Sequence, residues 1–342
     1  MWRPTIPNPT IPLGSTILVT GANGLIASTL VDQLLAAGYY VRGTVRDATK
    51  CGWLVSTLED LHGPGRLELV EVPDISKNGA WDAAVRGVYG ISHVIGAVTN
   101  NDPHIDKYLE AEMTAHISLL EAAQAEERMK SFVLTSSAFA AWTPDASKKA
   151  NLEQWDWNQE AIDLARSDAE EKGLGPLMAL KTLIEQRIWE WVRSKQLRFT
   201  FNSILLDTVI GHCLHTKDIG IPSTNGMVQW VYDGVNLDLI ALMQPQWFIN
   251  TRDAALLYIA ALTTRGVDGE RLFGFGGRYS WPKVAQILQQ LYPEKNVTTL
   301  ADNGWDQTEV PNKRSEELLR SVKLTTWDGL EESVKEASEC FI

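Results

Sequence analysis

Thr16-Ile-Leu-Val-Thr-Gly-Ala-Asn-Gly-Leu-Ile-Ala27 is a stretch that runs from a strand, through a tight turn, into a helix. Residues 16–20 form a short apolar, β-branched run, whereas residues 24–37 place their apolar side chains at helical spacing. Gly21 and Gly24 lie at the junction, where the absence of a side chain permits a tight turn and a close approach to a ligand. The stretch therefore predicts a strand, a turn and a helix around a binding site.

A second strand completes a βαβ unit. Gly38 ends the helix, and residues 39–45 are typical of a buried strand. Two glycines at such a turn, with Ala27 at the helix-packing place, are typical of dinucleotide-binding proteins, in which the pyrophosphate rests on the helix N-terminus. A purely structural turn is the alternative. The residues expected to bind the dinucleotide here are Gly21, Asn23, Gly24, Leu25 and Ile26.

The residues after the second strand distinguish two forms of the dinucleotide. An acid there binds the ribose hydroxyls of NAD, whereas a base binds the 2′-phosphate of NADP. Arg46 offers a planar guanidinium suited to a phosphate, and Lys50 follows one turn later. We therefore expect NADP(H); the alternative is that both bases are solvated and that Asp47 binds a ribose.

Strands and helices continue to alternate along the chain. Buried strands are predicted at 67–70, 91–95, 131–135 and 199–205, and helices at 104–127 and 176–194. This order predicts an α/β fold, a Rossmann-type doubly wound parallel sheet. After residue 212 the pattern is irregular, with loops expected around 219–226 and 266–279. We expect an NADP(H)-binding domain over 1–211 and a smaller C-terminal substrate-binding lobe over 212–342, some of whose strands return to the sheet.

Composition limits the choice of partners. The 342 residues carry 31 Lys and Arg against 43 Asp and Glu, and a net charge of −12 disfavours nucleic acid and anionic membranes. Cys51, Cys213 and Cys340 have no disulfide or metal-type spacing, which favours a reducing compartment and no metal site. We find neither a signal peptide nor a membrane span. We expect a cytoplasmic monomer or homodimer that binds a small molecule.

Motifs spread along nearly the whole chain resemble the extended short-chain dehydrogenase/reductase superfamily. Within it, the chain looks like the fungal aldehyde reductase II carbonyl reductases, which are related to plant dihydroflavonol reductases. The motifs include Val19-Thr-Gly-Ala-Asn-Gly24, Val41-Arg-Gly-Thr44, Phe132-Val-Leu-Thr-Ser-Ser137, Trp157-Asn158 and Leu291-Tyr-Pro293. The resemblance implies that Asp74 and Ile75, after the third strand, contact the adenine and that Ile95 and Gly96 line the adenosine side.

The resemblance also implies a catalytic Ser, Tyr and Lys. In that chemistry Ser polarises a carbonyl, Tyr transfers a proton, and Lys four residues later holds the nicotinamide ribose and lowers the Tyr pKa. Ser137 and Lys181 match the Ser and the Lys, but Leu177 occupies the Tyr position. A leucine has no proton to give. The sequence therefore predicts that cofactor binding is kept and that the reductase mechanism of the family is altered.

Other residues could replace the missing proton donor. Tyr279 precedes Lys283 by four residues, but Ser280 and Pro282 predict a helix start that leaves Tyr279 outside the helix. Asp207, on the loop after the sixth strand, is the candidate catalytic acid, and His212 and His215 are weaker candidates. Residues of these types are more often structural than catalytic.

The substrate pocket is expected to be large and apolar. Of the 13 tryptophans, seven lie within residues 142–247, among them Trp142, Trp155, Trp230 and Trp247 as pocket candidates. Each could equally belong to the core. The pocket walls implied by the resemblance are Phe139, Trp142, Leu177, Met227, Trp230, Met243, Gln246 and Trp247.

Three functions are compatible with these residues. The first is an NADP(H)-binding enzyme that catalyses an isomerisation, elimination or cyclisation of an apolar, aromatic or polycyclic natural product, because positioning and electrostatics accelerate such steps without a Tyr. The second is an NADPH-dependent carbonyl reductase with a substitute proton donor. The third is a redox-inactive protein that senses NADP(H) or binds a partner.

Overall fold

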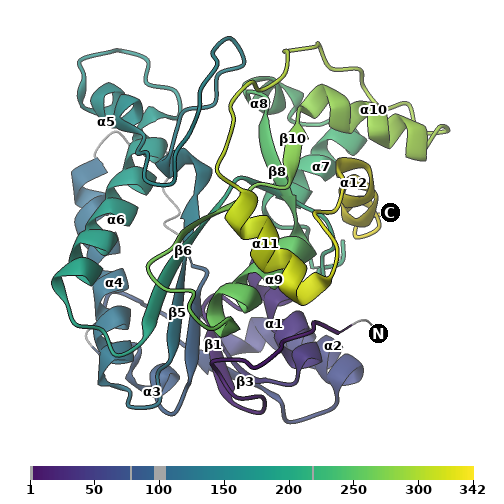
Figure 1. Cartoon of the computed structure of the whole chain (residues 1–342). Helices are drawn as coiled ribbons and strands as arrows, with labels where there is room; N and C mark the ends of the chain where they lie inside the picture. Colours follow the sequence, from purple (N-terminus) through teal and green to yellow (C-terminus); the bar gives the residue numbers. More distant parts are fainter. Residues whose placement is uncertain (1–2, 78, 96–104, 218) are drawn as a thin grey trace.

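A seven-stranded parallel sheet forms the centre of the protein (Figure 1). The computed structural model describes residues 3–77, 79–95, 105–217 and 219–342. The strand order is β3-β2-β1-β4-β5-β6-β9, so the order reverses between β1 and β4, where parallel sheets open a crevice at their carboxyl ends. The strands are β1 Thr16–Val19, β2 Tyr40–Val45, β3 Leu67–Glu71, β4 Gly90–His93, β5 Ser131–Ser137, β6 Thr200–Leu206 and β9 Arg271–Gly274.

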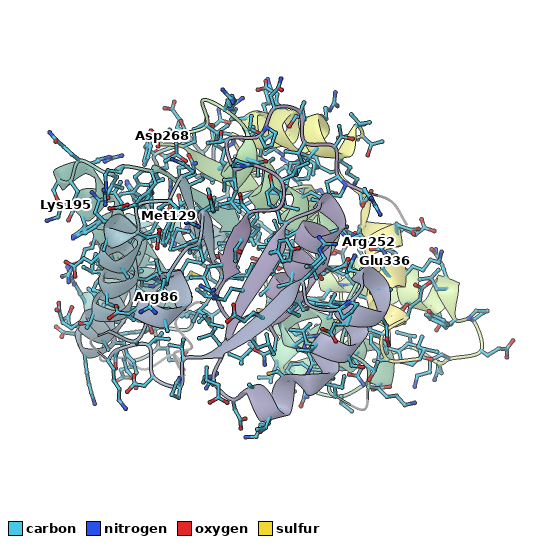
Figure 2. All side chains as sticks on the ribbon, turned by 90° about the horizontal axis from the view of Figure 1, so that it is seen from below. Arg86, Met129, Lys195, Arg252, Asp268 and Glu336 are labelled. Atoms are coloured by element: carbon cyan, nitrogen blue, oxygen red, sulfur yellow. The ribbon has the colours of Figure 1, made fainter. Side chains whose placement is uncertain are left out.

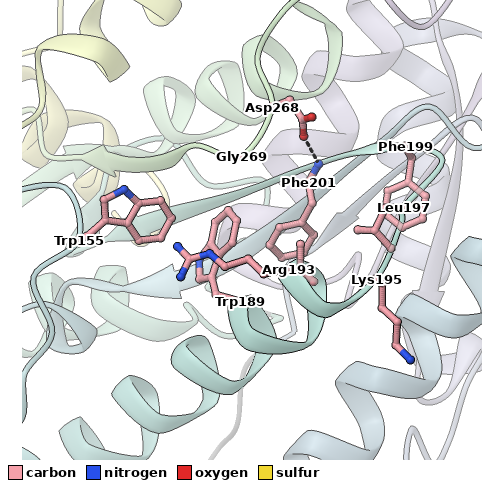
Figure 3. A pocket seen from close by; sticks show the side chains of 10 residues that line it. Trp155, Trp189, Arg193, Lys195, Leu197, Phe199, Phe201, Asp268 and Gly269 are labelled. Carbon is pink, nitrogen blue, oxygen red and sulfur yellow. Dashed lines mark hydrogen bonds between the residues drawn. The ribbon is translucent and has the colours of Figure 1, made fainter.

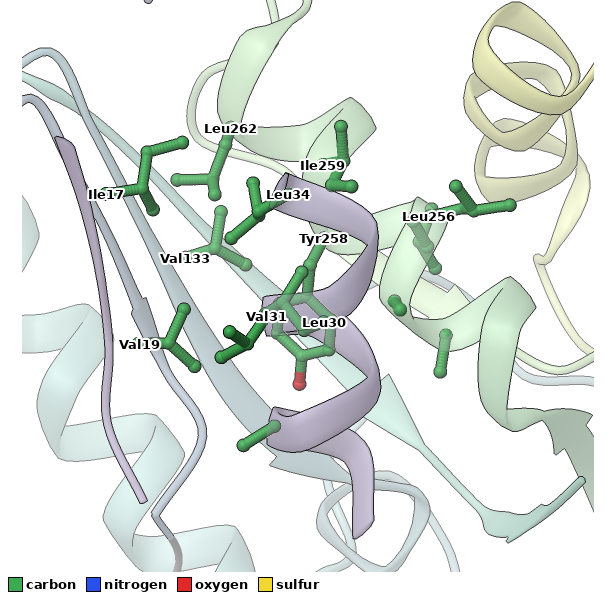
Figure 4. Packing of buried hydrophobic residues seen from close by; sticks show 14 of the residues in the cluster. Ile17, Val19, Leu30, Val31, Leu34, Val133, Leu256, Tyr258, Ile259 and Leu262 are labelled. Carbon is green, nitrogen blue, oxygen red and sulfur yellow. The ribbon is translucent and has the colours of Figure 1, made fainter. Parts of the chain in front are cut away.

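Helices cover both faces of the sheet because alternate side chains of a strand point to opposite faces. Ile17 and Val19 of β1 pack with α1 and α9 on one face (Figure 4), and Leu18 packs with α4 and α6 on the other. The first face holds α1 Leu25–Ala37, α2 Gly52–His62, α9 Thr251–Thr263 and α11 Lys313–Lys323; the second holds α3 Asp82–Val85, α4 Ile105–Ala125, α5 Gln159–Arg166 and α6 Gly175–Ser194. The predicted Rossmann-type fold is confirmed.

A second sheet lies beyond the carboxyl end of the first. Its order is β10-β8-β7, with β7 parallel and β10 antiparallel to β8, and β7 follows β6 after the single residue Asp207. The strands are β7 Thr208–Ile210, β8 Gln246–Asn250 and β10 Gly277–Tyr279, and the surrounding helices are α7 Ser223–Asp233, α8 Leu237–Ala241, α10 Trp281–Leu291 and α12 Leu330–Ser338. The exact division into two domains at residue 211 stays a prediction.

The two segments expected to be loops are partly regular structure. Residues 266–279 contain β9 and β10, and α7 begins at Ser223 inside the expected loop 219–226. Glycines break the strand pattern in the first segment, but Gly274 is required by packing, because an added Cβ would lie 2.7 Å from Leu206 Cδ2. As expected, α10 begins after Ser280, whose Oγ accepts a hydrogen bond from Lys283 N, and Tyr279 lies outside the helix.

A buried ion pair fixes α6 against β9. Arg271 donates from Nε and Nη2 to the two carboxylate oxygens of Glu185, at 3.1 and 3.0 Å. Ser203 Oγ donates to the same carboxylate at 2.7 Å, and the guanidinium lies 4.0 Å from the Trp157 ring centroid. Since both charges are buried and fully bonded, rotation of α6 would leave buried charges without their partners, at a large energetic cost. This network sets the orientation of the helix that carries Lys181.

The C-terminal helix is attached to the start of α9. Arg252 Nη1 donates to Glu336 Oε1 at 2.5 Å, and the two side chains are seen together in Figure 2. None of the described helices combines the length and the apolar character needed to cross a membrane.

Candidate functional site

A cavity of about 960 Å³ lies at the carboxyl ends of β1, β2, β3 and β4. It occupies the crevice beside the point where the strand order reverses. Gly96 lies outside the described residues, and Lys181 is not part of the cavity wall. The other residues predicted to bind the cofactor all line it: Gly21, Asn23, Gly24, Leu25, Ile26, Arg46, Lys50, Asp74, Ile75 and Ile95.

The glycine turn has the geometry of an anion site. Gly21 has a φ of +65°, and a Cβ at this position would lie 2.9 Å from Ile95 Cγ1. Gly21 N donates to Thr44 Oγ1 at 3.2 Å, which ties the turn to β2. Among the described residues, no side chain caps the N-terminus of α1, and its first turn holds no acid. The helix start therefore directs uncompensated N–H groups into the cavity, which suits a pyrophosphate.

The end of β2 presents a base to the cavity. Arg46 is exposed at the cavity wall, and Lys50 Nζ lies 3.3 Å from Asp47 Oδ2. Asp47 Oδ1 accepts hydrogen bonds from Thr49 N and Thr49 Oγ1, and these bonds lower the pKa of Asp47. Asp47 caps the short 3₁₀ helix at Ala48–Cys51, so its carboxylate is already engaged, and a phosphate at Arg46 stays a prediction.

Asp74, after the neighbouring strand β3, also lines the cavity. Ser76 donates to Asp74 Oδ1 from its backbone N at 3.0 Å and from its Oγ at 2.6 Å, which lowers the pKa of Asp74. The carboxylate is therefore ionised and fixed in a turn beside Ile75. Its contact with an adenine stays a prediction.

Ser137 ends β5, and Lys181 on α6 lies beside the two residues that precede it. Ser137 is the last residue of the strand, and its Oγ accepts a hydrogen bond from Phe139 N at 3.2 Å, so its O–H proton is directed elsewhere. Lys181 lines a small cavity of about 60 Å³ together with Thr135 and Ser136. Burial lowers the pKa of Lys181, and the negative charge of Glu112 opposes this effect. The catalytic roles of both residues stay predictions.

Leu177 occupies the position at which the resemblance implies a tyrosine. It lies four residues before Lys181 in a continuous helix, so both side chains lie on one face of α6. Leu177 is half-buried. A hydrocarbon therefore stands where the resemblance implies a proton donor.

Asp207 links the two sheets. Its Oδ1 accepts a hydrogen bond from Thr208 N at 2.7 Å, and its Oδ2 accepts one from Trp247 N at 3.0 Å. Burial raises the pKa of Asp207 to about 8, although these hydrogen bonds act in the opposite direction. The carboxyl is thus largely protonated near neutral pH, but it is not among the residues that line the 960 Å³ cavity. Its role as an acid stays a prediction.

None of the residues expected to form the substrate pocket lines the 960 Å³ cavity. Trp142 and Trp247 belong to a buried cluster, with ring centroids 5.5 and 6.1 Å from that of Phe275. Met227, Trp230 and Met243 pack against the core of the smaller lobe, and Gln246 Nε2 donates to Tyr279 Oη. Phe139 packs against the core on the α4 and α6 face. Contact of these residues with a substrate stays a prediction.

Trp155 lies at the other end of the sheet, contrary to expectation. Its ring packs edge-on against Trp189 at 5.0 Å, and Arg193 lies 4.5 Å above it (Figure 3). These side chains line a separate cavity of about 300 Å³ with Phe199 and Gly269, which precede β6 and β9. The clustering of tryptophans in the sequence therefore does not mark one pocket, because residues close in sequence reach opposite ends of a parallel sheet.

Several residues of the cavity wall were not predicted to bind the cofactor. His215, considered only as an acid, donates from Nε2 to Asn23 O at 2.8 Å, and its ring lies 4.5 Å from Trp53. This contact brings the smaller lobe onto the glycine turn. Glu112 lies within the predicted helix 104–127, where its sequence position does not distinguish it from solvent-facing acids.

No group of three or more potential metal-binding side chains occurs among the described residues.

The chain is similar to known proteins along most of its length. A profile of the NAD dependent epimerase/dehydratase family matches residues 17–200. The chain is 33% identical over 336 residues to aldehyde reductase 2 of Sporidiobolus salmonicolor, covering 97% of each protein. It is 35% identical over 335 residues to ketoreductase adrE of Penicillium roqueforti, covering 96% of this chain and 97% of the relative. The structure of Gre2 from Candida albicans in complex with NADPH has a TM-score of 0.78 at 21% identity, covering 96% of this chain and 98% of that chain.

Proposed function

Because the chain belongs to the NAD dependent epimerase/dehydratase family, we propose that it is an NADP(H)-binding enzyme that transforms a small apolar molecule without net hydride transfer. The substrate class would be an aromatic or polycyclic carbonyl compound of the natural-product type. The observation that carries the proposal is Leu177, one turn before Lys181 on α6, at the place of the family's proton donor. Two relatives named as reductases give the family background against which this change stands out.

The cavity fits NADP(H) at its phosphate-binding end. The uncapped start of α1 and the positive φ of Gly21 suit a pyrophosphate, and Arg46 suits the additional phosphate that distinguishes NADP from NAD. When bound, the cofactor supplies or accepts a hydride at its nicotinamide ring. The binding of NADPH by Gre2, a protein of the same fold, supports this assignment.

The residues at the end of β5 suit enolate chemistry. Ser137 would donate its O–H proton to a substrate carbonyl and stabilise the negative charge that develops on the oxygen. The Lys181 ammonium, at the small cavity beside the preceding residues Thr135 and Ser136, would add positive charge. Isomerisations, eliminations and cyclisations of carbonyl compounds proceed through such an enolate and need no hydride. Leu177 would contribute only an apolar wall, whereas reduction of the carbonyl requires a proton on the resulting alkoxide.

A carbonyl reductase is the second candidate, and one observation favours it. Asp207 has a pKa of about 8, so its carboxyl holds a proton near neutral pH. Against this role, both of its oxygens already accept backbone hydrogen bonds, from Thr208 and Trp247. A redox-inactive NADP(H) sensor, the third candidate from the sequence, has no specific support in the residues of the cavity.

The experiment that tests the proposal restores the phenol. We expect the parent protein to oxidise NADPH very slowly with α-tetralone, an aromatic ketone, and Leu177→Tyr to raise this rate by about 10² to 10⁴. Leu177→Phe is the matched control, because it adds the same ring without a proton donor and should give no increase. NADPH absorbance measures reduction, and deuterium uptake next to the carbonyl in D₂O measures enolate formation. A parent that reduces the ketone as fast as Leu177→Tyr would show that the protein is a reductase.

A further inference from the structure

Four polar side chains form a continuous column from the glycine turn to the wall of the cofactor cavity. Thr20 precedes Gly21, and its Oγ1 lies 3.0 Å from His93 Nδ1. His93 Nε2 lies 2.8 Å from His116 Nδ1. His116 Nε2 in turn lies 3.6 Å from Oε2 of Glu112, one turn earlier on α4. Thr20, His93 and His116 are buried, whereas Glu112 lines the 960 Å³ cavity.

The hydrogen-bond partners determine the direction of every proton in the column. Thr20 Oγ1 accepts hydrogen bonds from Val94 N at 2.9 Å and Ile95 N at 3.2 Å, so its own O–H donates to His93 Nδ1. Burial and the neighbouring imidazole hold the pKa of His93 well below its usual value, so this ring is neutral. Its single proton is therefore on Nε2 and is donated to His116 Nδ1. The proton of His116 is then on Nε2, which faces the Glu112 carboxylate.

The Glu112 carboxylate thus faces a histidine N–H and lies within electrostatic range of the Lys181 ammonium. Its negative charge favours the charged form of Lys181, which burial disfavours. The 3.6 Å separation from His116 is longer than a hydrogen bond, and contacts of this kind tighten when a ligand fills an active site. A column that served packing alone would account for the two histidines, but it would not place an acid on the cavity wall.

We propose that Glu112 is the proton-transfer group of this active site, and that His93 and His116 are positioning residues that direct its carboxylate toward the substrate. This inference rests on the proposed function and deepens it, because an enolate mechanism needs a base. In the forward step, a Glu112 oxygen takes the proton from the carbon next to the carbonyl. The C–H electron pair becomes the C=C bond of the enolate, and the carbonyl π pair moves to the oxygen held by Ser137.

The second half of the reaction returns the proton. In an isomerisation, Glu112 gives the same proton to another carbon of the conjugated system, and the negative charge on oxygen returns to the carbonyl π bond. In an elimination, the enolate electron pair forms a new C=C bond and expels a leaving group from the neighbouring carbon; the group departs with its bonding pair and takes the proton from Glu112. No oxidant or reductant is consumed in either case, which is consistent with a site that lacks the phenol.

The direction of the column is testable without a substrate. In two-bond ¹H–¹⁵N correlation spectra of ¹⁵N-histidine-labelled protein saturated with NADP⁺, we expect His93 and His116 each to carry a proton on Nε2 and none on Nδ1. His116→Gln identifies the His116 signals by their loss. A His116 ring protonated on Nδ1 would point no proton at Glu112 in this arrangement and would overturn the inference.

The catalytic role is tested by deuterium exchange of α-tetralone with the NADP⁺-loaded protein. Glu112→Gln should lower the exchange rate by about 10² to 10⁴. Glu110→Gln is the matched control, because Glu110 lies on the same helix but is exposed and paired with Arg187, and it should leave the rate unchanged. His116→Leu should lower the rate by about tenfold, as expected for an outer hydrogen-bond partner, and His116→Gln, which retains a donor, should recover part of the loss. Thermal melts confirm that each variant is folded.

The outcomes separate this inference from the proposed function. If the parent exchanges deuterium and Glu112→Gln does so equally fast, the inference is wrong and the proposed function stands. If the parent reduces α-tetralone without exchange, the proposed function is wrong, and the rate of NADPH oxidation by Glu112→Gln then decides whether Glu112 transfers the proton. If the parent acts on α-tetralone in neither way, the histidine spectra decide.

Discussion

At the scale of single residues, the exposed guanidinium of Arg46 stands at the wall of the cofactor cavity beside a lysine that Asp47 already holds. We expect Arg46→Ala to weaken NADPH binding by about 10- to 100-fold, because charge-assisted hydrogen bonds to a phosphate contribute about 1.5–3 kcal/mol. NADH affinity should hardly change, since NADH lacks the 2′-phosphate. Calorimetric titration with both cofactors measures the difference, with Lys50→Ala as the comparison. An equal loss for NADPH and NADH would place the phosphate elsewhere.

Asp207 gives a prediction on the pH dependence of stability. Burial raises its pKa in the folded protein to about 8 from an ordinary value of 3.8, so the folded state binds the proton more tightly than the unfolded chain does. The stabilisation is therefore complete below about pH 4 and is lost as the pH rises through 8. Asp207→Asn does not titrate, so the stability of the parent relative to this variant should fall by about 4 kcal/mol from pH 5 to pH 9, at about 1.4 kcal/mol for each pH unit up to the folded pKa. Urea unfolding at several pH values measures this difference, which a pH-independent offset would contradict.

The site residues divide according to how they were recognised. Glycines and bases at the ends of strands follow from backbone geometry and charge, so the motif led directly to Gly21, Gly24 and Arg46 on the cavity wall. Glu112 could not be found in this way. Its importance depends on two histidines, one of which lies on β4, and only the packing of α4 against the sheet brings them together.

At the scale of elements, helices with a clear periodicity were predicted nearly to the residue. The apolar face and Pro176 at the helix start predicted residues 176–194, and α6 spans Gly175–Ser194. The short strands β9 and β10 were missed because each has only three or four residues, and a glycine ends β9 and begins β10. Their strand conformation comes from partners far along the chain, since β9 pairs with β6 and β10 with β8. Local sequence does not encode such pairing.

The packing of α6 explains how one element can keep its place while its chemistry changes. Glu185 is bonded to Arg271 and Ser203, and these contacts fix the helix without involving Leu177. If Leu177 takes the place of a tyrosine, as the proposed function holds, we therefore expect the exchange to leave the backbone and Lys181 in position. The packing of α6 constrains where the side chain at position 177 lies, but it does not constrain the chemical group that this side chain carries.

At the scale of the whole molecule, the smaller lobe reaches the cofactor cavity through a chain of contacts that begins at the C-terminal helix. Glu336 on α12 accepts hydrogen bonds from Arg252 Nη1, from Asn250 Nδ2 at 2.9 Å and from His212 N at 3.3 Å. Three residues later, His215 donates to Asn23 O in the glycine turn. The C-terminal helix thus supports a loop that forms part of the cavity wall.

We therefore expect Glu336→Ala to affect both stability and cofactor binding. Loss of the carboxylate leaves the His212 N–H without its acceptor and the Asn250 amide with Ser333 Oγ alone, at a cost of about 3 kcal/mol in the free energy of unfolding. Because the loop that carries His215 loses its support, NADPH affinity should also fall, and calorimetry on the folded variant measures this change. Glu339→Ala removes an exposed acid from the end of the same helix and should alter neither quantity. The unfolding measurement reports the contacts of α12, whereas the titration reports the shape of the cavity. A Glu336→Ala variant that is destabilised but binds NADPH with unchanged affinity would therefore show that α12 does not influence the cofactor cavity.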